Sequence, residues 1–257
     1  MKITHLGGPT TLIEVGGWRI LTDPTFDPPG RRYAFGWGTA SRKVAGPALP
    51  ADAVGPVDLV LLSHDHHADN LDDAGRALLG SAAVVVTTIS GSRRLTPAAA
   101  GQDRGEAIRG LMPWEVTVVG APGKAPLKIT ATPCRHGPPL SRPIVGDVVG
   151  FSVEWDGGQF WMTGDTVLYG ALREAAARLT VDVLVLHLGS VKFGLTGPLR
   201  YSMSGAEGAE LIRLAKPRVA VPVHYEGWSH FSERPEHLRQ ALGDRVRWLE
   251  PGVATEL

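Results

Sequence analysis

Two halves of the chain repeat one order of predicted elements, and this repeat constrains the fold more than any other feature. Apolar runs at 12–15 and 18–21 flank Gly16-Gly17, a pair that readily adopts the positive φ angles of a two-residue hairpin turn. Residues 151–155 and 160–162 flank Asp156-Gly-Gly in the same way. A strand, a helix and another strand follow each hairpin. Two sheets between layers of helices would satisfy this order, which predicts an α/β fold.

The individual elements follow from short apolar runs and helix signals. Strands are expected at 57–62, 82–86, 182–186 and 218–223, and helices at 71–79, 171–179, 204–215 and 235–242. Ser204 and Glu207 have the spacing of a capping box, in which each side chain binds a free backbone N–H of the other residue. The Pro-rich stretch 23–50 predicts a long irregular loop, and such loops in compact domains are often functional.

Composition narrows the class of protein. The 257 residues include 26 basic and 26 acidic side chains, and this balance argues against a nucleic-acid binder, which usually carries a basic surplus. One cysteine excludes an intrachain disulfide and a Cys-rich zinc module. No apolar run approaches the roughly 20 residues of a membrane span, and the N-terminus lacks the apolar core of a signal peptide. We therefore expect a cytoplasmic protein with one domain over 1–257.

Histidines gather where predicted strands end. His64, His66 and His67 follow the strand at 57–62, and His136, Asp165, His187 and His224 follow later strands. A site at one edge of a sheet needs polar residues at such positions. In an extended segment residues i and i+2 point the same way, so His64 and His66 could bind one metal ion. The other histidines do not share this pattern: His5 and His237 read as structural, and His187 stays open.

The ordered set resembles the metal ligands of the metallo-β-lactamase superfamily. The matching residues are His64-Asp-His66-His-Ala-Asp69-Asn70, His136, Asp165 and His224. The segments Leu21-Thr-Asp-Pro24 and Thr163-Gly-Asp-Thr166 are similar to the branch with ascorbate-6-phosphate lactonase-like and N-acyl-phosphatidylethanolamine phospholipase-like enzymes. The resemblance covers nearly the whole chain. It implies a four-layer αββα sandwich with two pseudo-repeated halves.

The chain departs from the family motif at one place. The family has Asp four residues after the first His and His at five, but Ala68 and Asp69 stand there, followed by Asn70. One inserted residue would make Asp69 the family's Asp and Asn70 the replacement for its His. Alternatively, His67 is a shifted ligand.

The resemblance then divides the ligands between two metal sites. It implies a first site of His64, His66, His136 and Asp165 and a second of Asp69, His224, bridging Asp165 and Asn70. An amide oxygen is a weaker ligand than an imidazole, so the second site is expected to be weaker or to favour manganese or iron over zinc.

These residues predict a metal-dependent hydrolase with one or two zinc ions. A divalent ion lowers the pKa of bound water to about 7, and the resulting hydroxide attacks a carbonyl or phosphoryl centre. The resemblance implies that Asp69 orients the nucleophile and accepts its proton. His230, in the loop after His224, is interpreted as catalytic, because an imidazole can protonate a leaving group. The rival hypotheses are a non-catalytic or regulatory metal-binding protein and a di-iron redox enzyme.

Other residues complete the expectations. The partner is a small-molecule substrate, with a lactone, a phosphodiester and an amide all open. An anionic substrate is one option, because basic residues such as Arg93, Arg135 and Arg142 lie in predicted loops. Asp23 ends the first hairpin and is expected to support a ligand histidine. Cys134 is interpreted as a buried spectator, since no neighbouring sequence motif activates it.

Overall fold

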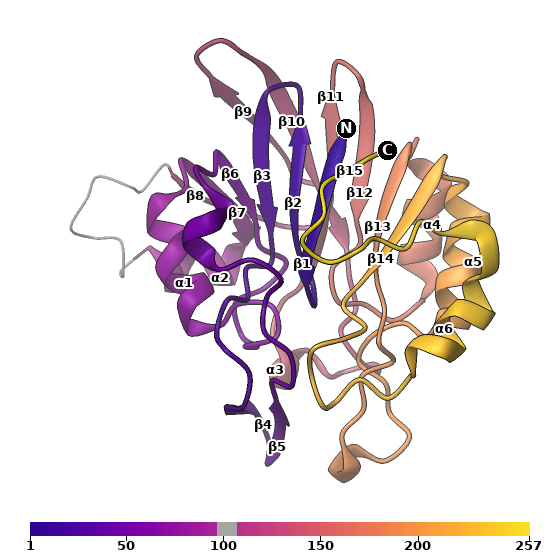
Figure 1. Ribbon diagram of the computed structural model, residues 1–257. Helices are drawn as coiled ribbons and strands as arrows, with labels where there is room; N and C mark the ends of the chain where they lie inside the picture. The colour runs from indigo at the N-terminus through magenta and orange to yellow at the C-terminus, as the bar shows by residue number, and fades with distance from the viewer. Residues whose placement is uncertain (97–106) are drawn as a thin grey trace.

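The protein consists of two β-sheets that pack face to face between layers of helices (Figure 1). The computed structural model describes residues 1–96 and 107–257. Helices α1 and α2 cover one sheet, and α4, α5 and α6 cover the other. This arrangement confirms the predicted αββα sandwich.

The first sheet comes from the N-terminal half, with the last strand of the chain added at its edge. Its seven strands within the described residues lie in the order β15, β1, β2, β3, β6, β7, β8. Their bounds are Thr255–Glu256, Lys2–Gly7, Thr10–Val15, Trp18–Thr22, Leu59–Leu61, Val84–Thr88 and Ile108–Leu111. The strands β1, β2 and β3 are antiparallel, and β3, β6, β7 and β8 are parallel.

The second sheet repeats this pairing. Its order is β14, β13, β12, β11, β10, β9. Their bounds are Val219–Val223, Val183–His187, Gly158–Met162, Val149–Trp155, Lys124–Pro133 and Val116–Ala121. The strands β9 to β12 are antiparallel, whereas β12, β13 and β14 are parallel. Both sheets thus pass from a hairpin into parallel strands, which confirms the two similar halves.

Each sheet has apolar side chains on both faces, because one face packs against the other sheet and the opposite face packs against helices. In β2, Ile13 points into the core between the sheets and Leu12 points to the layer of α1 (Asp73–Leu78) and α2 (Ile89–Leu95), as the alternation of a strand requires. The second sheet is covered by α4 (Gly170–Arg178), α5 (Gly205–Ala215) and α6 (Pro235–Leu242). The short α3 spans Arg142–Val145, and single 3₁₀ turns occupy Ala51–Val54, Leu79–Ser81, Gly194–Thr196 (η4) and Gly243–Arg245.

The local sequence signals hold in detail. Gly16 and Gly17 have φ angles of 53° and 79° between β2 and β3, as the hairpin prediction required. The capping box of Ser204 and Glu207 is present at the start of α5. The stretch 23–50 differs from the expectation of an irregular loop, since it contains the hairpin of β4 (Arg32–Gly36) and β5 (Thr39–Arg42). Tyr33 and Phe35 of β4 are buried, and this burial stabilises a strand that Pro and Gly had obscured in the sequence.

A buried ion pair attaches this hairpin to the body of the protein. Lys43 Nζ lies 2.8 Å from Asp72 Oδ2, and the two side chains are 3% and 0% exposed. Asp72 also caps α1 by accepting from Gly75 N. Because Lys43→Met leaves a buried carboxylate without its cation, we expect the free energy of unfolding to fall by about 3 kcal/mol or more.

Urea unfolding monitored by circular dichroism measures this loss. Lys128→Met is the control, because the pair of Lys128 and Glu154 is solvent-exposed and should contribute less than about 1 kcal/mol. Equal losses in the two variants would contradict the structural role of the Lys43–Asp72 pair.

The polar residues predicted to follow strands do lie at one edge of the sandwich, the lower edge in Figure 1. His64 follows β6, His136 follows β10, Asp165 follows β12 and His224 follows β14. Among the described residues, no helix is long and apolar enough to cross a membrane.

Candidate metal centre

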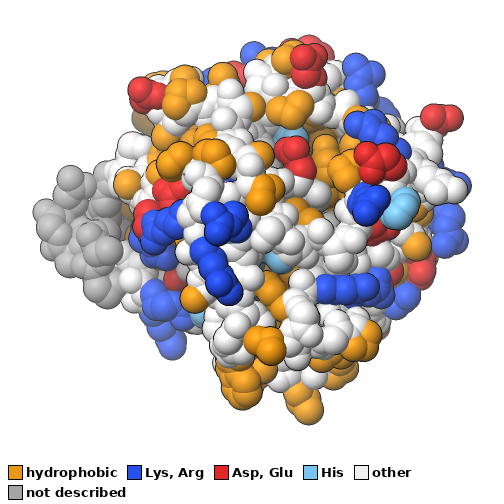
Figure 2. Space-filling view, turned by 60° about the horizontal axis from the view of Figure 1, so that its bottom comes forward, with side chains coloured by type: hydrophobic (Ala, Val, Ile, Leu, Met, Phe, Trp, Pro, Cys, Tyr) orange, Lys and Arg blue, Asp and Glu red, His pale blue; other side chains and the backbone are white. Residues whose placement is uncertain are grey.

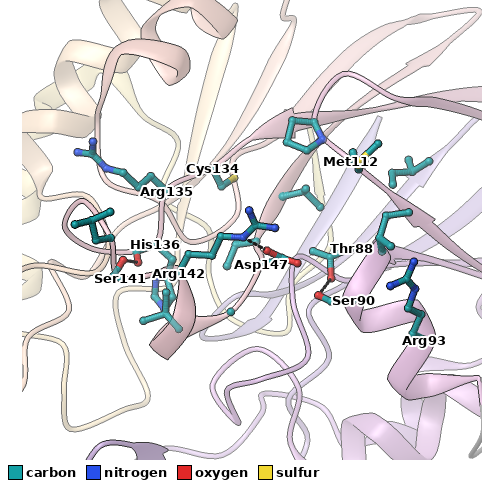
Figure 3. Close-up of a pocket in the computed structure, with 18 of the residues that line it drawn as sticks. Thr88, Ser90, Arg93, Met112, Cys134, Arg135, His136, Ser141, Arg142 and Asp147 are labelled. Atoms are coloured by element: carbon teal, nitrogen blue, oxygen red, sulfur yellow. Dashed lines mark hydrogen bonds and ion pairs between the residues drawn. The ribbon is translucent and has the colours of Figure 1, made fainter.

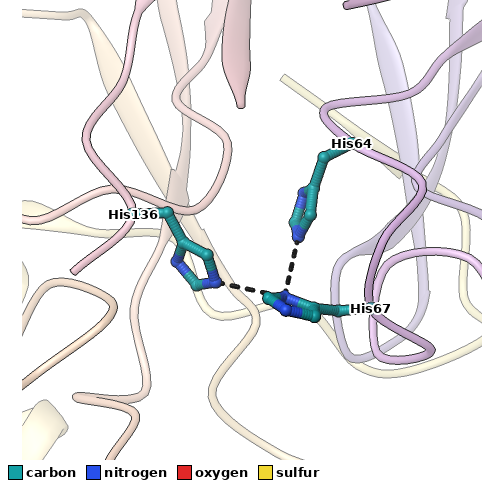
Figure 4. A group of neighbouring side chains, drawn as sticks. All are labelled: His64, His67 and His136. Atoms are coloured by element: carbon teal, nitrogen blue, oxygen red, sulfur yellow. Dashed lines mark hydrogen bonds between the residues drawn. The ribbon is translucent and has the colours of Figure 1, made fainter. Parts of the chain in front are cut away.

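Three buried histidines converge at this edge. His64 Nε2 and His136 Nε2 lie 3.3 and 3.2 Å from His67 Nδ1 (Figure 4). His64 and His67 come from the segment after β6, whereas His136 comes from the end of β10 in the other sheet. Packing of the two sheets therefore brings the three rings together.

The spacing of the three nitrogens matches a tetrahedral metal site. With zinc–nitrogen bonds of roughly 2.0–2.1 Å, two ligands of a tetrahedral ion are about 3.3–3.4 Å apart. The observed nitrogen separations of 3.2 and 3.3 Å agree with this value. Burial lowers the pKa of His67 to about 4 and that of His136 to about 3. Both rings are therefore neutral at neutral pH, as metal ligation requires.

Hydrogen bonds on the far side of the rings orient these nitrogens. His136 Nδ1 donates to Tyr201 O at 2.7 Å. His64 Nδ1 lies 2.9 Å from Ser63 Oγ, whose hydroxyl donates to Asp23 Oδ2 at 2.9 Å. With the proton on Nδ1, each ring directs the free electron pair of Nε2 into the cluster, which is the usual support of a ligand histidine.

A second cluster consists of Asp69, His224 and His230. One ligand atom from each lies within 4.8 Å of the other two. Asp69 Oδ2 is 3.4 Å from His224 Nε2 and 3.0 Å from His230 Nε2. His224 Nδ1 lies 3.2 Å from Leu188 O, which supports this ring as Tyr201 supports His136. Asp165 Oδ2 lies 3.2 Å from His224 Nε2, so Asp165 borders this cluster.

The donor atoms of both clusters suit a divalent cation. Asp69 Oδ1 and His230 Nδ1 are buried without a hydrogen-bond partner among the described residues, and the carboxylates of Asp69 and Asp165 both face His224. Burial raises the pKa of Asp165 to about 7, and the charges of Asp69 and Asp23 add to this effect. Two carboxylates buried beside one imidazole are costly, and a metal ion would stabilise them. The residues present therefore fit a metal centre.

The structure does not bring His66 into either cluster. Its ring packs against Gly146, where an added Cβ would collide with it. His66 Nδ1 lies 3.4 Å from Arg94 Nη2 and 3.7 Å from Asp65 Oδ1. His67 takes the place beside His64 and His136 that the sequence analysis expected for His66, although the sequence had offered His67 only as an alternative to Asn70.

Asn70, Asp23 and His187 form a layer behind the histidines. Asn70 Nδ2 donates to Asp23 Oδ2 at 3.2 Å and to Ser63 Oγ at 3.4 Å, and Asn70 Oδ1 has no partner among the described residues. Asp23 Oδ2 also lies 3.4 Å from His187 Nε2. Asn70 was expected to be a ligand, but its amide group faces Asp23. His187, which the sequence left open, belongs to the same layer.

Asp23→Asn should weaken metal binding by about 10–100-fold, because the amide cannot accept all the hydrogen bonds that orient Ser63 and, through it, His64. The metal dissociation constant, measured by competition with a chromogenic chelator, tests this expectation. Asp156→Asn is the control, because Asp156 is exposed in the corresponding hairpin turn of the second sheet. An unchanged metal affinity in Asp23→Asn would show that the contact with Ser63 is dispensable.

The remaining candidates lie outside the clusters. His5 is buried, and its Nε2 lies 3.0 Å from Gly8 O. His237 is exposed on α6. Cys134 Sγ donates to Thr163 O at 3.0 Å, and burial raises the pKa of its thiol well above the usual value. Such a thiol is a poor nucleophile, in agreement with its interpretation as a spectator.

Two cavities adjoin the metal centre. The smaller, of about 180 Å³, is lined by His67, Asp69 and His136 and so reaches both clusters. The larger, of about 530 Å³, reaches only His136 among the candidate ligands. In Figure 3 the ion pair of Arg142 and Asp147 crosses the larger cavity, with Arg93 and Arg135 on opposite sides. Figure 2 turns the lower edge of Figure 1 toward the viewer. Histidine side chains are visible in recesses of this face, with hydrophobic side chains beside them.

Comparison with known proteins agrees with this site. The family model described as a β-lactamase superfamily domain matches residues 18–225. A UPF0173 metal-dependent hydrolase from Pyrococcus abyssi is 29% identical over 261 residues and is covered completely, as is this chain. Among solved structures, a possible metal-dependent hydrolase from Veillonella parvula superposes with a TM-score of 0.81 at 18% identity. The superposition covers 100% of this chain and 99% of that one.

An isothiocyanate hydrolase from Delia radicum gut bacteria has a TM-score of 0.80 at 20% identity, over 100% of this chain and 99% of the other. The chain belongs to the β-lactamase superfamily. This assignment confirms the superfamily predicted from the histidine pattern, and the relative from Pyrococcus abyssi is named a metal-dependent hydrolase. The branch within the superfamily stays a prediction.

Proposed function

We propose that this chain is a two-metal hydrolase that acts on a carbonyl or phosphoryl centre of a small substrate. His64, His67 and His136 would hold one ion, and Asp69, His224 and His230 the other. The observation that carries the proposal is that His64 Nε2 and His136 Nε2 lie 3.3 and 3.2 Å from His67 Nδ1, the spacing of tetrahedral zinc ligands. Asp165, whose Oδ2 lies 3.2 Å from His224 Nε2, would supply a further carboxylate to the metal centre.

His230 changes the expectation for the second site. The sequence predicted a weakened site, because Asn70 stands where the family has a histidine. In the fold, His230 supplies an imidazole to the same cluster as Asp69 and His224. We therefore assign His230 as a ligand in place of the catalytic role expected from sequence, and we expect the second site to bind metal well. Two histidines with one carboxylate suit iron as well as zinc.

Individual residues of the chain have separate roles in the proposed reaction. When bound, the ions would acidify a water molecule and polarise the reacting oxygen of the substrate. Asp69 Oδ1 is buried without a partner among the described residues, so it can accept the proton of the attacking water. Tyr201 O and Ser63 keep His136 and His64 in the tautomers that leave Nε2 free. The buried position of these groups excludes bulk water from the reaction.

Metal analysis of protein purified without chelator tests this proposal. We expect two equivalents of metal, with zinc as the main ion. Hydrolysis of an ester, a phosphodiester, a lactam or an isothiocyanate is then followed before and after treatment with dipicolinic acid. Activity on one of these classes should disappear on chelation and return with added metal. Protein without bound metal would overturn the proposal, and two irons with a visible absorption band would favour the redox alternative.

A further inference from the structure

The smaller cavity has walls that restrict which substrates can reach the metal centre. It is enclosed by residues of the β4–β5 hairpin, α3, η4 and the segment before η4. Apart from His67, Asp69 and His136, its lining is Phe35, Gly36, Trp37, Thr39, Ile144, Val145, Val191, Phe193, Leu195, Thr196 and Tyr201. This set contains no lysine or arginine.

Aromatic rings of the cavity lie directly against the candidate ligands. The ring centroid of Phe35 is 5.1 Å from that of His67 and 5.3 Å from that of His230. Phe193 lies 5.6 Å from His230, and Tyr201 lies 5.9 Å from His136. The apolar walls therefore begin at the metal ligands, and a group beside the reacting centre must contact them.

Both threonine hydroxyls of the walls are already engaged. Thr39 Oγ1 donates to Gly36 O at 2.6 Å, and Thr196 Oγ1 donates to Phe193 O at 3.0 Å. Basic residues near the metal centre lie outside this cavity: Arg94 pairs with Asp65 and Arg200 with Glu207, and the arginines beside His136 line the larger cavity instead. A carboxylate or phosphate substituent would lose its hydration in this cavity without gaining a counter-ion.

The mouth of the cavity is apolar as well. Trp37 is 78% exposed at the tip of the β4–β5 hairpin, and Leu195 of η4 is 75% exposed. These two segments meet, because a Cβ on Gly38 would lie 3.3 Å from Leu195 Cδ1. Large exposed apolar side chains at the rim of a cavity are typical of a ligand entrance.

We propose that the substrate carries a compact, uncharged apolar group, about the size of a phenyl ring, that occupies this cavity next to the group being hydrolysed. The volume of about 180 Å³ suits such a group, since an apolar cavity of roughly 150 Å³ holds benzene. The inference rests on the proposed hydrolase function, and it places any anionic substituent of the substrate outside this cavity.

Hydroxamic acids test the inference, because they bind metal ions while their side chains occupy the adjoining space. The metal-loaded protein is titrated by calorimetry with acetohydroxamic acid, phenylacetohydroxamic acid and the monohydroxamic acid of succinic acid, which carries a carboxylate. Burial of the phenyl ring should make phenylacetohydroxamic acid bind about 10-fold tighter than acetohydroxamic acid, or more. The succinic compound should bind no tighter than acetohydroxamic acid.

A matched pair of variants locates the effect. Ile144 lines the cavity and Leu214 lies on α5, and both side chains are 37% exposed. Ile144→Lys should remove most of the preference for the phenyl compound and should strengthen binding of the succinic compound. Leu214→Lys should leave all three affinities unchanged.

The outcomes separate this inference from the proposed function. Equal affinities for the acetic and phenylacetic compounds, or tightest binding of the succinic compound, would overturn the apolar cavity while the metal centre stands. The same holds if Ile144→Lys and Leu214→Lys behave alike. If the protein takes up no metal on loading and none of the three compounds binds, the proposed metal centre is wrong, and the inference falls with it.

Discussion

His67→Ala should lose the metal ion of the first cluster, whereas His66→Ala should retain it. His67 Nδ1 lies 3.3 and 3.2 Å from His64 Nε2 and His136 Nε2, at the centre of the cluster. The ring of His66 packs against Gly146 and contacts Arg94. Loss of a supporting residue already costs 10–100-fold in metal affinity or activity, so loss of a ligand should cost at least about 100-fold in activity.

Metal content and hydrolysis of the best substrate are measured side by side for the two variants. The pair is closely matched, because the same substitution is made at adjacent histidines. His67→Gln serves as a second variant with a more conservative side chain, and circular dichroism checks that each protein folds. Metal loss in His66→Ala and not in His67→Ala would restore the ligand set that the sequence first predicted.

His230→Ala should reduce the bound metal from two equivalents to one and lower activity by about 100-fold or more. His230 is buried, its Nε2 lies 3.0 Å from Asp69 Oδ2, and its Nδ1 has no hydrogen bond from the described residues. An imidazole nitrogen that faces a carboxylate in a cluster with His224 is suited to ligation. The metal content of the purified variant, measured before activity, tests this expectation.

His237→Ala provides the control for His230, since His237 is exposed on α6 and should affect neither metal nor activity. Two equivalents of metal in His230→Ala with slow turnover would return His230 to the catalytic role expected from sequence. Full activity together with two equivalents would place His230 in the structural scaffold.

Much of the fold could be predicted because local signals and tertiary packing agree. Gly16-Gly17 specifies a tight turn, and Ser204 with Glu207 starts α5 at the expected residue. The sequence analysis did not predict the strands β1, β8 and β9. β9 has exposed valines at 116 and 118, so its pattern does not indicate a buried strand. The hairpin of β4 and β5 was missed because it is stabilised by contacts of Tyr33 and Phe35 with Trp228, far away in the sequence.

The sequence placed the rings of His64 and His66 together, whereas the structure groups His64 with His67 and His136, since the segment after β6 does not continue as a strand. The amides of Asn70 and Leu71 both donate to His67 O, which shows a tight turn. The chain bends at 65–67, before that turn begins, so the ring of His67 meets that of His64 and the ring of His66 packs against Gly146 instead. Two-residue alternation applies only to extended chain.

By itself, the sequence determined that histidines and aspartates would follow several strands, and from this the class of the site and the superfamily could be derived. The carboxyl ends of strands that run in the same direction meet at one sheet edge whatever the loops do. The tertiary structure alone decided which side chains face the site. His230 reaches Asp69 through a loop that starts at His224, and the apolar cavity is built from four separate segments. Such contacts depend on how the two sheets and their loops pack, and the short-range spacing of residues in a sequence does not encode this packing.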